Sequence, residues 1–166
     1  MVSYVKNVRG VFLAKILVIS DTHRNISSAV DIIEDKNPDY VLHLGDMSDD
    51  CDELSYMYPR INVVGVRGNC DWQTLSNAPL ERMLDIEGVK ILMCHGHSYS
   101  VKKGIGAYCA VASVKGAHIA LFGHTHVPLI EQIGDSLLIN PGTVSTYAWI
   151  EVSNGKFNAT LHKVGD

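Results

Sequence analysis

Several short apolar runs in this chain each end in a cluster of Asp, Asn, His and Gly residues. In the clearest case, Ile119–Phe122 runs into Gly123-His124-Thr125-His126. Apolar runs of this length are typical of buried β-strands. Residues two apart on an extended chain point the same way, so His124 and His126 should face one space. The other clusters are Asp21-Thr22-His23, Gly45-Asp46, Gly68-Asn69-Cys70-Asp71 and His95-Gly96-His97. Strand ends that bring Asp, Asn and His side chains to one edge predict a metal site.

Length and composition exclude several other classes of protein. The 166 residues fit one domain with an ordinary core, and 46% of them are hydrophobic. The 14 Lys and Arg residues against 18 Asp and Glu residues give a net charge of −4 without a basic cluster, so we do not expect a nucleic-acid groove. The cysteines are scattered and form no Cys-x-x-Cys pair, which argues against a thiolate metal site or a disulfide framework.

The first residues are interpreted as an extension, residues 1–14, in front of a single domain over residues 15–166. Lys6 and Arg9 precede a short apolar run, but Lys15 interrupts it, so the resemblance to a signal peptide is superficial. No stretch approaches the roughly 18 apolar residues of a membrane span. We therefore expect a cytoplasmic protein without membrane contact. The extension is a flexible arm, a homo-oligomer contact or a start-site artefact.

The first half of the domain reads as alternating strands and helices. Strands are predicted over 16–19, 40–44 and 61–66, each a short apolar run. A helix is predicted from Ile26, capped by Asn25 and ended by Pro38, and a shorter one runs from Asp50 to Tyr58. Strand–helix–strand units of this length imply parallel pairing with right-handed crossovers.

The second half is richer in hairpins. Glu87-Gly88 should form a tight turn between strands 80–86 and 89–93, and residues 105–115 fit a helix of small residues. After the strand 118–122 the chain alternates strand and turn, with strands expected at 128–133, 136–139, 147–152 and 156–161. These features predict an α/β (α+β) fold of two mixed sheets packed face to face, with helices outside. The metal-bearing loops should gather at the carboxyl ends of the strands.

The donor atoms in the clusters fit a centre of two metal ions. Carboxylate, imidazole and amide-oxygen ligands suit Mn²⁺, Fe²⁺, Zn²⁺ or Co²⁺, and the lack of thiolates argues against structural zinc. Two divalent ions, two carboxylates and a bridging hydroxide leave a net charge of about +1, which attracts an anionic ester. The candidate ligands are Asp21, His23, Asp46, Asn69, His95, His124 and His126.

In their order along the chain, the motifs D-x-H, GD, GN, HGH and GHTH resemble those of the calcineurin-like metallophosphoesterase superfamily. The longer segments 20–23, 43–46, 68–71 and 140–142 are similar to its small single-domain branch, the YfcE-type phosphodiesterases. The resemblance covers residue 15 to the end and implies a four-layer αββα sandwich. It also implies that one ion binds Asp21, His23 and His126, that the other binds Asn69, His95 and His124, and that Asp46 bridges them. Of the two divalent ions, Mn²⁺ is the preferred identity, with Zn²⁺, Fe²⁺, Ni²⁺ and Co²⁺ as alternatives.

One departure from the family concerns the group that protonates the leaving oxygen. Larger relatives carry His directly after the Asn of the GN motif, whereas this chain has Cys70. A thiol with an ordinary pKa near 8.5 is mostly neutral at pH 7 and can donate a proton. His97 is the other candidate acid or phosphate ligand. Asp71 either orients such a group or caps the next segment.

The remaining histidines are expected to have structural roles. His43 and His118 lie within strands and are interpreted as packed side chains or as hydrogen-bond partners of ligands. His162 follows the last strand and should lie at the surface.

The sequence thus predicts hydrolysis of phosphodiesters by a hydroxide that bridges two metal ions. The expected substrate is a small phosphodiester or another phosphate-containing molecule. A phosphomonoesterase is an alternative, as is a non-catalytic scaffold of the kind formed by a retromer subunit with the same fold. A DNA nuclease fits the acidic composition less well.

Overall fold

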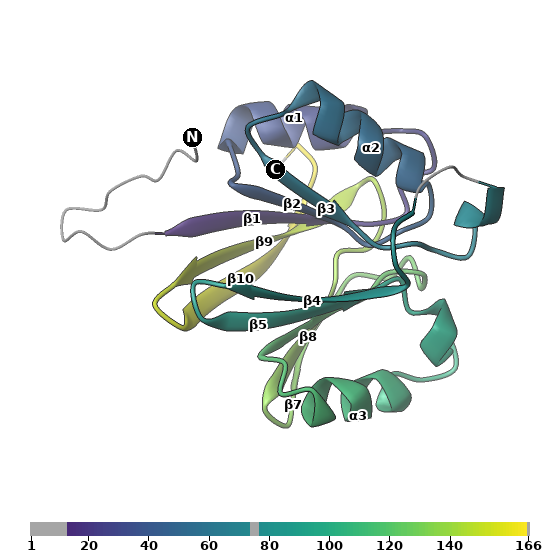
Figure 1. Ribbon diagram of the computed structural model, residues 1–166, viewed down its shortest axis with the longest axis vertical. Helices are drawn as coiled ribbons and strands as arrows, with labels where there is room; N and C mark the ends of the chain where they lie inside the picture. The colour runs from purple at the N-terminus through teal and green to yellow at the C-terminus, as the bar shows by residue number, and fades with distance from the viewer. Residues whose placement is uncertain (1–12, 74–76, 166) are drawn as a thin grey trace.

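The structure, a computed structural model, describes residues 13–73 and 77–165. Within these residues the chain forms two five-stranded sheets that pack face to face. Helices α1 and α2 cover the outer face of one sheet, and helix α3 covers the outer face of the other (Figure 1). This arrangement confirms the predicted four-layer αββα sandwich of mixed sheets.

The first sheet has the strand order β10-β9-β1-β2-β3. Strands β1, β2 and β3 are parallel, and β9 runs antiparallel to both β1 and β10. The strands are β1 (Ala14–Ile19), β2 (Tyr40–His43), β3 (Asn62–Gly65), β9 (Thr146–Ser153) and β10 (Lys156–Lys163). The crossovers from β1 to β2 and from β2 to β3 contain α1 (Ser27–Lys36) and α2 (Ser48–Met57).

The second sheet has the order β4-β5-β6-β8-β7, in which β5, β6 and β8 are parallel and the two edge strands are antiparallel. The strands are β4 (Glu81–Ile86), β5 (Val89–Cys94), β6 (Ile119–Leu121), β7 (Leu129–Ile133) and β8 (Ser136–Asn140). Helix α3 (Gly106–Val114) connects β5 to β6, and short 3₁₀ turns follow β3 and β5, namely η1 (Asp71–Gln73) and η2 (His97–Tyr99).

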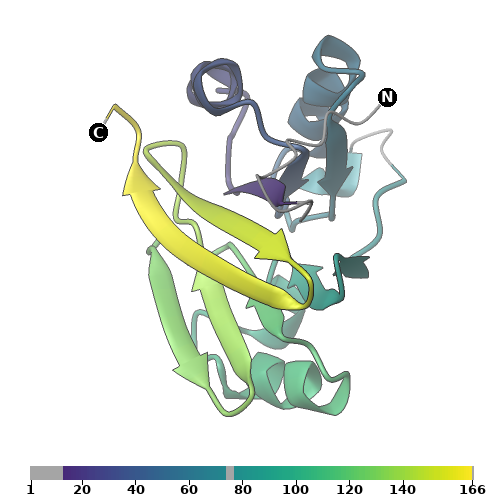
Figure 2. The same ribbon diagram turned by 90° about the vertical axis from the view of Figure 1, so that its left-hand side faces the viewer.

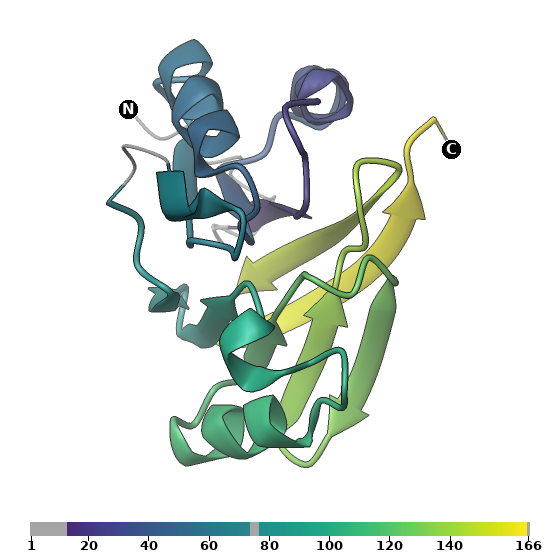
Figure 3. The same ribbon diagram turned by 90° about the vertical axis from the view of Figure 1, so that its right-hand side faces the viewer.

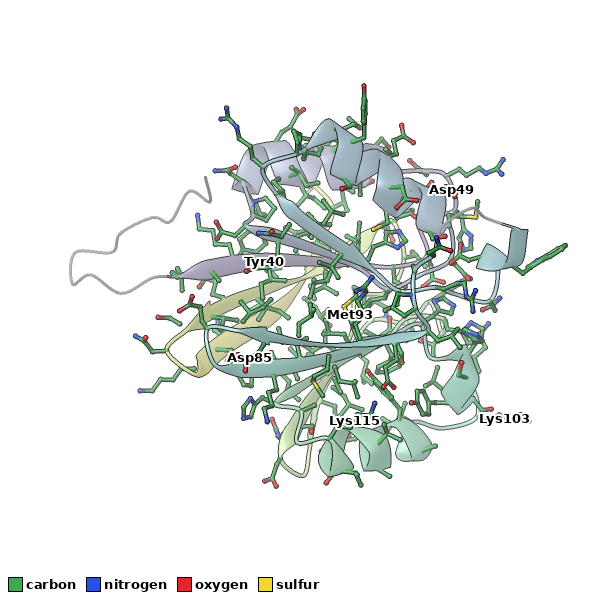
Figure 4. The ribbon with its side chains drawn as sticks, in the orientation of Figure 1. Tyr40, Asp49, Asp85, Met93, Lys103 and Lys115 are labelled. Carbon is green, nitrogen blue, oxygen red and sulfur yellow. The ribbon has the colours of Figure 1, made fainter. Side chains whose placement is uncertain are left out.

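The central parallel strands are apolar along both faces because both faces are covered. In β1, Ile16 and Val18 belong to the core between the sheets, whereas Leu17 and Ile19 pack under α1 and α2. Met93 of β5 is fully buried between the two sheets (Figure 4). Alternation along each strand therefore supplies one side chain to the central core and the next to a helix layer.

Several predicted boundaries differ from the structure by one or two residues. Helix α1 has Ile26 as its N-cap, with no side-chain capping bond, and the Asn25 side chain accepts a hydrogen bond from the Ser27 hydroxyl instead. The predicted Asn25 cap is therefore wrong. Helix α2 begins at Ser48, two residues before the predicted start at Asp50. Strand β1 already includes Ala14, while residues 1–12 of the predicted extension lie outside the described residues.

The parallel strands of both sheets run in one direction, so their carboxyl ends meet at one end of the sandwich (Figure 1). Figure 3 looks onto this end, where the loops after β1, β2, β3, β5 and β6 lie close together. The opposite view shows the long β9–β10 hairpin curving across the sandwich (Figure 2). In the part of the chain that is described, no helix is long and apolar enough to cross a membrane.

Candidate metal centre

The candidate ligands come from five strand ends, and the fold brings them together. Their donor atoms form two groups, within each of which the atoms lie within 4.8 Å of one another. The first group is Asp21, His23 and His126, and the second is Asp46, His95 and His124. The Asn69 amide oxygen lies 3.1 Å from His95 Nε2 and so joins the second group. The grouping agrees with the division of His23, His95, His124 and His126 that the motifs imply, whereas Asp46, expected to bridge two ions, falls in the second group alone.

The backbone at the ligands adopts a conformation that side chains other than glycine rarely take. Residues Asp21 and Asp46 both have φ of 55°, and His124 and His126 have φ of 67° and 61°. This left-handed conformation costs about 1–2 kcal/mol per residue. Such strain clusters at functional sites, where the surrounding contacts hold it in place.

Gly123 permits the close approach of two of these loops. A Cβ at this position would collide with the Ser20 hydroxyl and would lie 2.9 Å from Asp21 Oδ2. Because glycine has no side chain, the backbone N–H of His124 can donate a hydrogen bond to the same Oδ2 at 3.1 Å. The glycine of the GHTH motif therefore lets the loop after β6 pack against the loop after β1.

The first group is centred on the buried carboxylate of Asp21. Its Oδ1 lies 3.1 Å from His126 Nε2, and its Oδ2 accepts a hydrogen bond of 2.6 Å from the Ser20 hydroxyl. These bonds fix the orientation of a side chain that is only 1% exposed. His23 and His126 are exposed, so this group faces solvent and is the more accessible of the two.

The second group is centred on His95, which is fully buried. Its Nδ1 lies 2.8 Å from the carbonyl oxygen of Leu44, which requires a proton on Nδ1. In the neutral imidazole Nε2 then carries a lone pair, yet it faces Asn69 Oδ1 and His124 Nδ1 at 3.1 Å and Asp46 Oδ2 at 3.4 Å. Electron pairs that converge in this way need a positive charge between them.

The pKa shifts at the site also indicate that a positive charge is favoured between these groups. Burial opposes a charge on His95, but the hydrogen bond and negative charge of Asp46, together with Asp21, outweigh it and raise the pKa of His95 above its usual value. For Asp46, burial acts in the opposite direction, and the contacts with His95 and the Cys70 N–H lower the pKa of the carboxyl. Burial and the neighbouring His95 and Lys102 lower the pKa of His124.

The donor set fits divalent transition-metal ions. Asp21 and Asp46 supply carboxylate oxygens, Asn69 supplies an amide oxygen, and the rest of the set is imidazole nitrogen. Ions such as Mn²⁺, Fe²⁺, Zn²⁺ and Co²⁺ prefer such mixed nitrogen and oxygen ligands. The Leu44 carbonyl behind His95 provides a hydrogen bond that fixes the tautomer of the ring, as outer partners of metal-binding histidines do.

Cys70 and His97, the two candidate proton donors, both lie beside the second group. The Cys70 side chain is exposed, and its backbone N–H donates to Asp46 Oδ1 at 2.9 Å. Partial burial and the nearby carboxylates, Asp46 first, raise the pKa of its thiol, so the thiol stays protonated at neutral pH. The His97 ring centroid is 5.5 Å from that of His95, and burial and the charge of His95 lower the pKa of His97. A role in catalysis for either side chain stays a prediction.

Asp71, the third predicted catalytic residue, is bound to backbone N–H groups. It is 2% exposed, and its Oδ1 accepts hydrogen bonds from Met47 and Ser48 at 2.8 and 2.7 Å. Its Oδ2 accepts one from Gly68 at 2.7 Å. The carboxylate therefore ties the loop after β3 to the start of α2. These bonds reach the start of α2, which precedes Asp71 in the sequence, so both the predicted capping of the next segment and a catalytic part for Asp71 stay predictions.

Asn140 is a structural residue of the site to which the sequence attached no role. Its side-chain amide donates to the Gly123 carbonyl at 3.0 Å and to the Thr125 hydroxyl at 2.9 Å, and its Oδ1 accepts from the Gly142 N–H. The amide thus braces the GHTH loop from β8. The available signal was Asn140-Pro141-Gly142, which follows a strand just as the ligand motifs do.

Among the described residues, the remaining histidines lie outside both groups. His43 is fully buried and hydrogen-bonds the Thr22 hydroxyl, as expected of a partner to a ligand loop. His118 is exposed and accepts a hydrogen bond from the Lys90 N–H. His162 stacks on Tyr147 with ring centroids 5.1 Å apart.

Fold and site together define a metallophosphoesterase domain. A model of the calcineurin-like phosphoesterase superfamily domain matches residues 14–155, and the chain belongs to this superfamily. Among curated relatives, a probable metallophosphoesterase of Methanocaldococcus jannaschii is 33% identical over 131 residues, which are 76% of this chain and 66% of the relative. A phosphodiesterase of the same organism is 30% identical over 149 residues, which are 80% of this chain and 86% of the relative.

Solved structures show the same fold. The structure of a predicted phosphoesterase from Streptococcus pneumoniae is similar with a TM-score of 0.74 and 26% identity, over 91% of this chain and 90% of the other. Vacuolar protein sorting 29 from Cryptosporidium parvum has a TM-score of 0.70 and 19% identity, over 92% and 98% of the two chains. At that identity the second similarity shows the fold alone.

Proposed function

We propose that this protein is a hydrolase of small phosphodiesters that depends on two divalent metal ions. The observation that carries the proposal is the position of His95 Nε2, which lies 3.4 Å from Asp46 Oδ2 and 4.0 Å from Asp21 Oδ1. A single nitrogen atom thus lies near the carboxylates of both ligand groups. The two groups are adjacent, and one phosphoryl group can meet both.

Different residues of the protein would bind the two ions and contact the substrate. Asp21, His23 and His126 would hold one ion, Asn69, His95 and His124 the other, and Asp46 would contact both through its two oxygens. Divalent ions bound there polarise phosphoryl oxygens and make water acidic enough to act as a nucleophile near neutral pH. Cys70 and His97, beside the second group, would contact the leaving oxygen or a phosphoryl oxygen.

The preference for a diester rests on charge and on a relative's name. A centre of about +1 suits a singly charged diester, and the exposed first group leaves room for two substituents on phosphorus. One of the similar curated proteins is named a phosphodiesterase. Mn²⁺ is the ion we expect to support the highest rate.

Metal-depleted protein tests the proposal directly. Mn²⁺, Zn²⁺, Fe²⁺, Ni²⁺ or Co²⁺ is added back, binding stoichiometry is measured, and turnover is compared on bis-p-nitrophenyl phosphate and p-nitrophenyl phosphate. We expect two ions per chain and faster hydrolysis of the diester with Mn²⁺. A large preference for the monoester across all ions would replace the diester assignment with a phosphomonoesterase.

A protein-binding scaffold is the second candidate, because vacuolar protein sorting 29 has the same fold. The complete donor set favours the enzyme. Two bound ions without turnover of any ester in the same experiment would favour the scaffold.

A further inference from the structure

A buried hydrogen-bonded chain lies directly behind the first group of ligands. His43, Thr22 and Asp50 are 0%, 3% and 4% exposed, respectively. His43 Nε2 lies 2.9 Å from Thr22 Oγ1, which in turn lies 2.5 Å from Asp50 Oδ2. The three side chains come from the end of β2, the loop after β1 and the first turn of α2.

The direction of each bond follows from the ends of the chain. The backbone N–H of Gly45 donates to His43 Nδ1 at 3.2 Å, so the proton of the neutral ring is on Nε2 and is donated to Thr22 Oγ1. The Thr22 hydroxyl must then donate its own proton to Asp50 Oδ2. Burial keeps His43 neutral by lowering its pKa to about 4. The direction of every bond is therefore fixed, and Thr22 connects His43 to Asp50 by accepting from the first and donating to the second.

The hydrogen bonds of Thr22 and Asp50 hold the most strained part of the loop after β1, which carries the candidate ligands Asp21 and His23. Asp21, His23 and Arg24 have φ of 55°, 47° and 64°, all in the left-handed region. Asp50 Oδ2 accepts hydrogen bonds both from the Thr22 hydroxyl and from the Arg24 N–H at 2.8 Å. The Asp50 carboxylate therefore binds the residues on both sides of His23. Without this grip the strained residues would relax toward commoner backbone conformations and carry their side chains away from His126.

We propose that Thr22, held between His43 and Asp50, is the positioning residue that sets Asp21 and His23 for the first metal ion. The inference rests on the proposed two-ion function and adds that Thr22 serves only the first of the two ions. Thr22 touches no reacting atom. It acts through its hydrogen bonds with His43 and Asp50. The second ion, held by residues from other loops, should be nearly independent of it.

The test is a titration of metal-depleted protein with Mn²⁺, followed by calorimetry, on Thr22→Val and Thr22→Ser. Valine keeps the shape and removes both hydrogen bonds, whereas serine keeps the hydroxyl. Loss of an outer partner typically weakens metal binding by about 10–100-fold. We expect that loss for one ion in Thr22→Val, little change for the other ion, and recovery in Thr22→Ser. His126→Gln, which removes a ligand of the first group alone, identifies the affected ion.

Ser136→Ala is the matched control. The Ser136 hydroxyl is also buried and donates to the Ala117 carbonyl at 2.6 Å. Ser136 lies at the start of β8, away from the strand ends that carry the ligands. The control should lose stability without changing either metal affinity. Asp50→Asn should also weaken binding of the first ion, because it alters the same hydrogen bonds. The double variant of Asp50→Asn and Thr22→Val should bind metal no more weakly than the single variant with the lower affinity, because both changes act through one interaction.

Three results would overturn the inference, and two of them concern Thr22→Val. One is wild-type affinity for both ions in Thr22→Val, and the other is an equal weakening of both ions that follows the loss of thermal stability. Wild-type protein that binds fewer than two ions would also overturn it. Two bound ions without ester hydrolysis would refute the proposed function, and the same affinities would still decide the role of Thr22.

Discussion

Single residues at the site were predictable wherever chemistry and position coincide. His124 and His126 follow an apolar strand, alternate along the chain and carry metal-binding side chains, so the sequence alone indicated them. Thr22 and Asp50 gave no such signal, because a threonine and an aspartate 28 residues apart form a contact only after the fold is made. Candidate ligands can therefore be predicted from local pattern, whereas the groups that orient them depend on tertiary structure.

Asp46→Asn tests the carboxylate that we propose as the bridge between two ions. Asn keeps one oxygen and the size of the side chain, but it loses the negative charge and the second oxygen. Binding of both ions should weaken by more than the roughly 10–100-fold expected for an outer partner, and hydrolysis should be lost, while the circular dichroism spectrum stays native. Asp49→Asn, an exposed residue in the first turn of α2, removes the same charge and should behave as wild type. Retained metal and near-normal turnover in Asp46→Asn would remove Asp46 from the centre.

Cys70 is tested through the leaving group. Its raised pKa keeps a proton on the thiol but makes the thiol a weak acid, so the departing oxygen should carry most of its charge unaided. The rate on a series of aryl and alkyl diesters should therefore fall steeply as the pKa of the leaving group rises, and Cys70→Ser should change little on p-nitrophenyl esters. A competent general acid is worth about 10²–10⁴-fold. If wild type cleaves alkyl diesters nearly as fast as aryl diesters and Cys70→Ser loses that ability, the thiol is a competent acid.

At the scale of elements, the parallel strands place the site and the first turn of α2 ties its loops together. Asp50 holds the loop after β1, and the Met47 and Ser48 N–H groups bind Asp71 from the loop after β3. The sequence predicted the strands and α1 to within two residues at most ends, because apolar runs and Pro38 are strong local signals. The start of α2 was misplaced because Met47 is an unlikely N-cap by sequence, with a φ of 79° and no side-chain capping bond.

Asp71→Asn separates a structural role from a catalytic one. The amide would place N–H donors against backbone N–H donors, leaving a buried group without its partner at a cost of about 1–3 kcal/mol. We expect a loss of that size in urea unfolding, with kcat reduced less than the affinity for metal. Asp85→Asn, whose carboxylate accepts from Gly88 in the exposed β4–β5 turn, is the control and should be nearly neutral. Unchanged stability with a large loss of kcat would make Asp71 a catalytic residue.

At the scale of the whole molecule, the sandwich places a hydrophobic core behind a polar edge. The sequence predicted two mixed sheets from the change between β–α–β units and hairpins, which is a global pattern. It did not predict that β9 and β10 return to the first sheet beside β1, because that pairing joins residues more than a hundred positions apart. Local periodicity identifies strands but carries little information on long-range partners.

The folding of the metal-free protein should depend on pH through His43. The folded protein takes up a proton on this ring only near pH 4, because burial lowers its pKa, whereas the unfolded chain does so near the ordinary value of 6.5. Between these values the unfolded state binds more protons, so stability falls as pH decreases from about 6.5 and stops falling on this account below about 4. The loss amounts to about 3 kcal/mol.

Urea unfolding of chelator-treated protein between pH 7 and pH 4 measures this loss, and His43→Gln isolates it. Carboxylates such as Asp46 add to acid destabilisation in both proteins, so the difference between the two pH profiles reports His43 itself. His95 contributes with the opposite sign, since its raised pKa adds stability at low pH that is lost as pH rises. Histidine ring signals in NMR give an independent reading. Protonation of His43 near pH 6.5 in the folded protein would contradict both its burial in the Thr22–Asp50 chain and the expected slope.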